Sequence, residues 1–114
     1  MTPTEIRLRR EARVLTVSFD DGEVFDYGFE YLRVHSPSAE VKGHGPGREK
    51  LQIGKQDVTV TAVKPVGHYA VRLIFDDGHD TGLYTWAYLR ELGDNMERNW
   101  QEYLDRLSAA GYAR

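Results

Sequence analysis

The four-residue sequence Phe-Asp-Asp-Gly occurs twice in this chain, at residues 19–22 and 75–78. Each copy ends a stretch in which apolar and polar residues alternate, which is the pattern of a half-buried β-strand. The glycine of an Asp-Gly pair supplies the positive φ that a tight turn requires. Each copy therefore predicts the end of a strand followed by a tight turn.

The first copy lies within a predicted set of strands. Residues 5–19 alternate between apolar and polar side chains, and a break near Glu11 divides them into two antiparallel strands. Residues 24–27 then return as a partner strand. Residues 29–34 predict one or two helical turns, which end before Pro37 because proline disfavours helical backbone in the residue before it.

The second copy has a similar setting. Residues 58–62 predict a strand that Lys64 and Pro65 end, and residues 69–75 predict the next strand. The sequence Pro-Val-Gly between these two strands indicates their connection.

Two helices are predicted after the second turn. Thr85 is a suitable N-cap for a helix over residues 86–92, and Gly93 occupies the position after its end. Asp94, followed three residues later by a glutamate, resembles a capping box for a last helix over about residues 94–110. Its apolar residues recur at helical spacing and predict a face that packs across the sheet: Met96, Trp100, Tyr103, Leu104 and Leu107.

A second motif repeats with the turns, since Tyr-Leu-Arg at residues 31–33 returns at residues 88–90. The two halves can thus form a pseudo-repeat at a spacing of about 56 residues. A chance match of two short motifs is the alternative. We predict an α+β fold, in which an antiparallel β-sheet is built from two hairpin-like pseudo-repeats with short helices and a C-terminal amphipathic helix.

Size and composition indicate one domain spanning residues 1–114. The net charge of −3 argues against a nucleic-acid partner. The absence of cysteine excludes disulfides and thiolate metal sites. We find no signal peptide and no apolar run that suits a membrane span, so we expect a cytoplasmic protein without a membrane partner.

The cluster Asp76-Asp77-Gly78-His79-Asp80 has two interpretations. Carboxylates and imidazole are ligands for a divalent metal, but adjacent residues of a tight turn rarely converge on one ion, and Asp-Gly is ordinary turn chemistry. No serine lies in a Gly-x-Ser-x-Gly elbow, and no nucleophile or metal-triad motif is present, so we do not expect an enzyme.

Residues 36–50 contain three glycines and two prolines, and we expect them to form a long loop without a regular element. The loop lacks the Lys-Ser/Thr pair of a P-loop. Its basic residues, in an acidic protein, suit an anion or an acidic partner: Lys42, His44, Arg48 and Lys50.

Three blocks of sequence, at residues 31–47, 65–70 and 75–92, resemble the small bacterial DUF971 proteins. These are similar to the N-terminal domain of gamma-butyrobetaine hydroxylase and trimethyllysine hydroxylase. In the hydroxylases, the resemblance implies a zinc site of three cysteines and one histidine. The matching positions here are Ser36, Ser38, Val41 and His79, so three of the four ligands are replaced and zinc is doubtful.

The resemblance also implies that residues 36–41 lie next to His79. The domain type occurs fused to P-loop iron-sulfur assembly factors, which suggests a role in cluster assembly or protein recruitment. We therefore expect a non-enzymatic binding or accessory module with an unknown protein partner and no required cofactor. The alternatives are a metal-binding protein, which would use His79 with His35 or His44 and nearby aspartates, and a domain that acts with a separate 2-oxoglutarate-dependent hydroxylase. The predicted partner surface comprises His35, Ser36, Ser38, Lys42, His44, Arg48, Asp77, His79 and Asp80.

Overall fold

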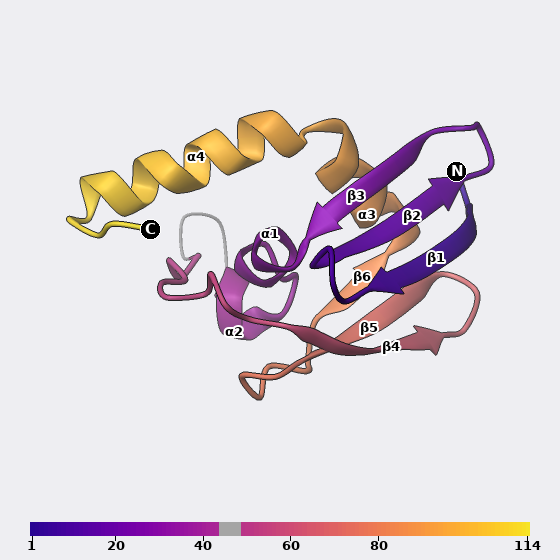
Figure 1. Cartoon of the computed structure of the whole chain (residues 1–114), viewed down its shortest axis with the longest axis horizontal. Helices are drawn as coiled ribbons and strands as arrows, with labels where there is room; N and C mark the ends of the chain where they lie inside the picture. Colours follow the sequence, from indigo (N-terminus) through magenta and orange to yellow (C-terminus); the bar gives the residue numbers. More distant parts are fainter. Residues whose placement is uncertain (44–48) are drawn as a thin grey trace.

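The computed structural model describes residues 1–43 and 49–114 (Figure 1). The first half consists of β1 (Pro3–Arg9), β2 (Val14–Phe19), β3 (Val24–Gly28) and α1 (Phe29–Val34). The second half consists of β4 (Val60–Val66), β5 (Ala70–Phe75), β6 (Leu83–Thr85) and α3 (Trp86–Asp94). The short helix α2 (Ala39–Lys42) follows α1, and α4 (Met96–Ala109) follows α3.

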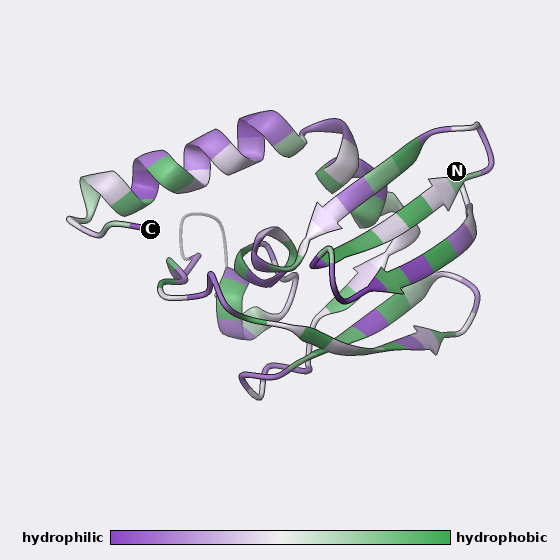
Figure 2. Cartoon of the chain, in the orientation of Figure 1, coloured by the Kyte–Doolittle hydropathy of each residue, from purple (hydrophilic) through white to green (hydrophobic). Residues whose placement is uncertain are grey.

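Each half forms its own three-stranded antiparallel sheet, with strand orders β1-β2-β3 and β4-β5-β6. The α+β prediction is confirmed, and so are the strands and Asp-Gly turns on which it rests. Hydrophobic and hydrophilic residues alternate along β1 and β2 (Figure 2). The apolar faces of the two sheets share one core, which includes Leu15, Val17, Leu73 and Phe75.

Four tyrosine hydroxyls make reciprocal contacts between the halves, which supports the predicted pseudo-repeat. The hydroxyl of Tyr27, in β3, donates a hydrogen bond of 2.6 Å to the carbonyl of Leu89 in α3. The hydroxyl of Tyr84, in β6, donates one of 2.6 Å to the carbonyl of Leu32 in α1. A second reciprocal pair joins Tyr31 to the carbonyl of Leu92 and Tyr88 to the carbonyl of His35. Each half therefore donates tyrosine hydrogen bonds to carbonyls in, or directly after, the first helix of the other half.

The second sheet differs in detail from the prediction. β4 begins later than predicted and continues through Pro65, which pairs with Val71. β4 lies at an edge of its sheet, where a residue without a backbone N–H is tolerated. The three-residue strand β6 was not predicted.

The helix boundaries also need correction. Gly93 lies inside α3 rather than after it, and the ring of Phe25 occupies the space that a side chain at Gly93 would fill. Asp94 pairs with Arg90 and does not form the predicted capping box, since the residue before α4 is Asn95. Residues 39–42 form α2, so the segment predicted as a loop contains one helical turn.

The last helix does not lie across a sheet. α4 lies next to α1 (Figure 1), and its buried face packs against Val34 at the end of α1 and against Leu51. Tyr103 and Leu107 are buried as predicted, and the hydroxyl of Tyr103 bonds to the carbonyl of Gln52. Within the described residues, no helix has the length and apolar character needed to cross a membrane.

Candidate functional site

His79 is the centre of a buried polar network at the second Asp-Gly turn. Its side chain is held there by the backbone: its N–H donates to the Asp77 carboxylate, and its carbonyl accepts from the N–H of Phe75. Gly78 has φ +88°, the left-handed conformation that such a turn requires. Only 5% of the surface of His79 is exposed.

Both ring nitrogens of His79 have partners on the segment after α1. Nε2 lies 2.7 Å from the hydroxyl of Ser36, and Nδ1 lies 3.0 Å from the Glu40 carboxylate. The nearby hydroxyls of Ser38 and Thr81 are 2.7 Å apart. The predicted contact between residues 36–41 and His79 is therefore present, and it fixes α2 on the second half.

The electrostatic surroundings keep His79 neutral. Burial lowers its pKa below the ordinary value, and the charge of Arg33 lowers it further, while Glu40 and Asp77 act in the opposite direction. Because the Glu40 carboxylate can only accept, Nδ1 carries the proton and donates to it. Nε2 then accepts a hydrogen bond from Ser36.

Asp77 closes the network on its other side. It forms ion pairs of 2.8 Å with Arg33 and with Lys55. Burial alone would raise the pKa of Asp77, but hydrogen bonds from Lys55, from the N–H of His79 and from Arg33 outweigh it and lower the pKa to about 2. Asp77 is therefore ionised at neutral pH.

This donor set does not fit zinc. The positions that match the family's cysteines hold two hydroxyls and one apolar side chain, Ser36, Ser38 and the buried Val41. Neutral hydroxyls and a valine cannot replace thiolates, and both nitrogens of His79 are already hydrogen-bonded. In residues 1–43 and 49–114, no three His, Asp or Glu residues are grouped so that they could hold a metal ion.

The order Ser36, His79, Glu40 resembles the hydrogen-bonded relay of a serine hydrolase, and sequence reasoning did not identify Glu40. The serine is nevertheless inaccessible, with 1% of its surface exposed. A Cβ built at Gly82 would lie 2.6 Å from its hydroxyl oxygen, so no space for a substrate carbonyl adjoins it. The three side chains therefore link the segment after α1 to the second turn.

The site marks a break in the pseudo-symmetry of the fold. In the first half, Phe25 precedes Tyr27 by two residues and its ring packs on Gly93. In the second half, Gly82 holds that position before Tyr84, and Ser36 packs on it. The aromatic contact between Phe25 and Gly93 in one half thus corresponds to a small polar contact between Ser36 and Gly82 in the other. The smaller contact leaves room for the ring of His79.

Two ion pairs, in contrast, occur at equivalent positions of the two halves. Arg90 pairs with Asp21 at 2.9 Å, as Arg33 pairs with Asp77. Sequence reasoning did not assign Arg33 to the site, although the repeated Tyr-Leu-Arg and Asp-Asp-Gly motifs carry both pairs and were the available signal.

The remaining predicted residues lie around the network. His35 faces away from it, with Nδ1 2.9 Å from the carbonyl of Tyr31. Lys42 is exposed and its ammonium lies 4.5 Å from the ring centroid of Tyr88. Asp80 is exposed and lies 3.7 Å from Arg72. Residues 44–48, which include the predicted contacts His44 and Arg48, lie outside the described residues.

A comparison with family models gives a match over residues 6–90 to the model described as gamma-butyrobetaine hydroxylase-like, N-terminal. The match includes both Asp-Asp-Gly turns and every residue of the His79 network. No curated protein matches the chain.

Several solved structures are similar to this chain in both sequence and fold. A crystal structure of a protein of unknown function from Acidithiobacillus ferrooxidans, described as belonging to the DUF971 family, is 44% identical, with a TM-score of 0.69 over 81% of this chain and 92% of that one. Two NMR solution structures are similar over 99% of this chain. One is 46% identical, with a TM-score of 0.86 and 89% of its own chain covered. The other is 50% identical, with a TM-score of 0.84 and 84% covered.

Proposed function

The chain belongs to the gamma-butyrobetaine hydroxylase-like N-terminal family, also described as DUF971, and we propose that it is a non-enzymatic accessory module that binds a protein partner. The proposed contact surface is the exposed side of α2 together with the turn at residues 77–81. The family description names a domain and not a reaction, so the proposal rests on the geometry of the site.

One observation supports it above the others. Every polar side chain at the centre of the site is used internally: both nitrogens of His79 are bonded, and Ser36 is buried against Gly82. Exposed charges surround this centre, with Lys42 on α2 and Asp80 after the turn. A buried network that fixes two segments under exposed charges suits the presentation of a rigid surface to a partner.

The finer form of the proposal concerns the kind of partner. The resemblance to domains fused to iron-sulfur assembly factors favours a partner in cluster assembly or protein recruitment, and this support is analogy between related domains. A separate 2-oxoglutarate-dependent hydroxylase is the other partner that the family suggests.

Quantitative co-purification with a charge-reversed surface tests the proposal. The variant Lys42→Glu/Asp80→Lys keeps the net charge and changes only exposed side chains. The matched control, Arg9→Glu/Glu23→Lys, does the same on the first half. We expect a specific partner to be lost from the first variant and retained by the control. Retention of all partners by both variants would contradict the proposal.

Metal analysis distinguishes the proposed accessory module from the metal-binding alternative. That alternative requires His79 to exchange its Ser36 or Glu40 hydrogen bond for a metal ion. In untagged protein, we expect less than about a tenth of an equivalent of any divalent metal, unchanged by His79→Ala. A stoichiometric metal that is lost in His79→Ala would favour the alternative.

A further inference from the structure

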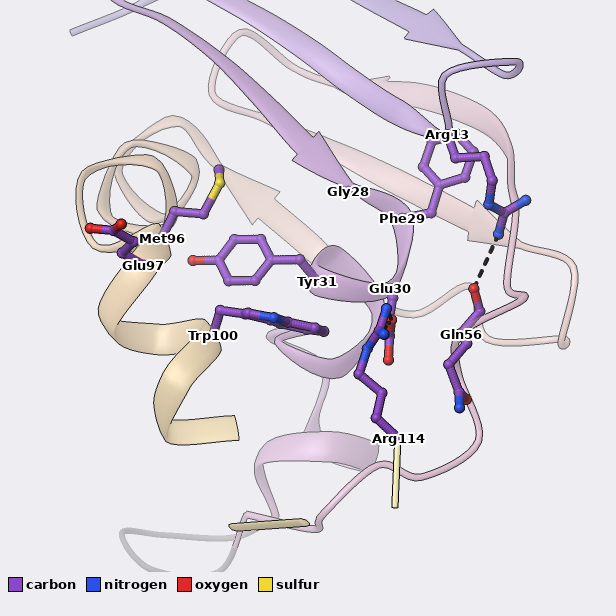
Figure 3. Close-up of a pocket in the computed structure, with 10 residues that line it drawn as sticks. All are labelled: Arg13, Gly28, Phe29, Glu30, Tyr31, Gln56, Met96, Glu97, Trp100 and Arg114. Carbon is purple, nitrogen blue, oxygen red and sulfur yellow. Dashed lines mark hydrogen bonds and ion pairs between the residues drawn. The ribbon is translucent and has the colours of Figure 1, made fainter. Parts of the chain in front are cut away.

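A cavity of about 460 Å³ lies beside α1 and the first half of α4 (Figure 3). Its walls are largely apolar and aromatic, formed by Phe29, Tyr31, Met96 and Trp100. A charged pair, Glu30 and Arg114, lies inside this apolar surround. The cavity shares no lining residue with the His79 network.

Glu30 is a buried carboxylate that is only half satisfied. Its exposed surface is 8%. Arg114 donates two hydrogen bonds to Oε1, of 3.0 Å from Nε and 2.6 Å from Nη2. The second oxygen, Oε2, is buried and has no hydrogen-bond partner among the described residues. A buried carboxylate needs a cation and hydrogen-bond donors to both oxygens. Glu30 therefore favours a cation that donates to Oε2 as well as to Oε1, which Arg114 does not do.

Arg114 occupies the cavity as a ligand would. Its guanidinium lies between the Glu30 carboxylate and the ring of Trp100, whose centroid is 5.2 Å away. Nearly half of its side chain, 49%, is exposed, and it lies five residues beyond the end of α4 at Ala109. Because this side chain is exposed and lies outside α4, it can leave the cavity without disturbing the helix.

The contacts of Arg114 are those that recognise an arginine, but in a poor geometry. Arginine binds a carboxylate best through two parallel hydrogen bonds, one to each oxygen. Arg114 instead uses one oxygen twice. A guanidinium from another molecule is not tied to the backbone of this chain, so it can bond to both oxygens of Glu30 and still stack on Trp100. Lysine offers neither the planar pair of donors nor the stacking.

We propose that this cavity recognises an arginine side chain of a partner protein, and that Arg114 is the internal occupant that the partner's arginine displaces. The pseudo-symmetry makes the site unique to the first half, because Ala87 follows Trp86 where Glu30 follows Phe29. Arg13, the other guanidinium of the lining, is already engaged: it lies over the ring of Phe29 and donates to the carbonyl of Val58.

The test uses the indole N–H signals of the two tryptophans, observed by NMR during titration. The probe is N-acetyl-arginine-N-methylamide, which mimics an arginine within a chain. In Arg114→Ala we expect a saturable shift of the Trp100 signal, while Trp86, whose indole bonds to the carbonyl of His68, serves as the reference. In the wild type we expect binding at least about tenfold weaker, because the probe binds only the fraction of molecules with an open cavity.

Two controls determine whether the recognition is the one proposed. The uncharged citrulline analogue should not bind to Arg114→Ala, and the arginine probe should not bind to Glu30→Gln/Arg114→Ala. The citrulline comparison needs no second substitution, so it decides the outcome even if the double variant fails to fold. Equal binding of citrulline, or no shift of Trp100 in Arg114→Ala, would overturn the proposal.

A last comparison, between the blocked probe and free L-arginine, distinguishes recognition of an arginine within a protein from recognition of the free amino acid. The blocked probe should bind at least as tightly as free L-arginine, because the contacts described here involve only the side chain. Binding of free L-arginine more than about tenfold tighter would show recognition of its charged amino or carboxylate group, and would overturn the assignment to a partner protein. The result is independent of the surface around Lys42, so either proposal can fail without the other.

Discussion

The hydroxyl of Ser36 and Nε2 of His79 lie 2.7 Å apart, although 43 residues separate them along the chain. The contact joins the end of the first half to the turn of the second. It exists because Gly82 leaves the space that Phe25 fills in the symmetry-related position. The network around His79 is thus a local departure from a fold that otherwise repeats its contacts.

Gly82→Ala tests whether this space is required. The new Cβ would lie 2.6 Å from the Ser36 hydroxyl and 3.1 Å from the ring of Tyr84. We expect a loss of about 2 kcal/mol in the free energy of unfolding, measured by urea denaturation, because overpacking a filled site forces neighbours to move. In Gly82→Ala/Ser36→Ala the hydroxyl is gone, so the combined loss should be smaller than the sum of the single losses. Strictly additive losses would show that Ser36 and Gly82 do not share this space.

The two symmetric ion pairs predict unequal effects of equivalent substitutions. Asp77→Asn leaves Arg33, with 8% of its side chain exposed, without its charged partner, and we expect a loss of about 2 kcal/mol. Asp21→Asn removes the equivalent partner of Arg90, but Arg90 is more exposed and keeps Asp94. Its loss in the same urea experiment should be clearly smaller. A larger loss of stability in Asp21→Asn than in Asp77→Asn would contradict the view that the Arg33–Asp77 pair contributes more to stability than the Arg90–Asp21 pair.

The stability of the protein should fall as the pH is lowered from 7.5 to 5. The pKa of His79, like that of His35, lies below its ordinary value mainly because of burial. A histidine with a lowered pKa contributes stability that is fully present above the unfolded pKa of about 6.5, and that is lost as the pH falls through the folded value.

His79→Gln should reduce this pH dependence, because glutamine does not titrate. Denaturation at the two pH values measures the change, and NMR titration of the imidazole signals gives the two pKa values directly. A pKa above about 6.5 for His79 would show that Glu40 and Asp77 outweigh burial, which reverses the expected sign.

The elements predicted correctly are those with a strong local signal. Alternation and the Asp-Gly turns predicted β1, β2, β3 and β5, and the Thr85 cap predicted the start of α3. The repeated Tyr-Leu-Arg motif indicated the pseudo-symmetry. It could not show that its tyrosine donates to the opposite half, since that contact depends on packing between segments far apart in sequence.

The errors arise where tertiary contacts override local preference. Gly93 lies inside α3, where the absence of a side chain makes room for Phe25, and Pro65 remains in a strand because β4 lies at an edge of its sheet. β6 has only three residues, too few for a period to be recognised. Glu40 lay in a segment whose glycines and prolines predicted a loop, so nothing local indicated its contact with His79.

Hydrogen exchange of the amides in residues 36–43 is the most direct test of the central claim, that His79 holds this segment in place without a metal. In the wild type, the amides of Lys42 and Gly43, which donate to Ser38 and Ala39, should be protected, and a chelator should not change their protection. In His79→Gln their protection should fall, while the amides of β2 keep theirs. Exchange that accelerates when a chelator is added, or protection that persists in His79→Gln, would contradict the account.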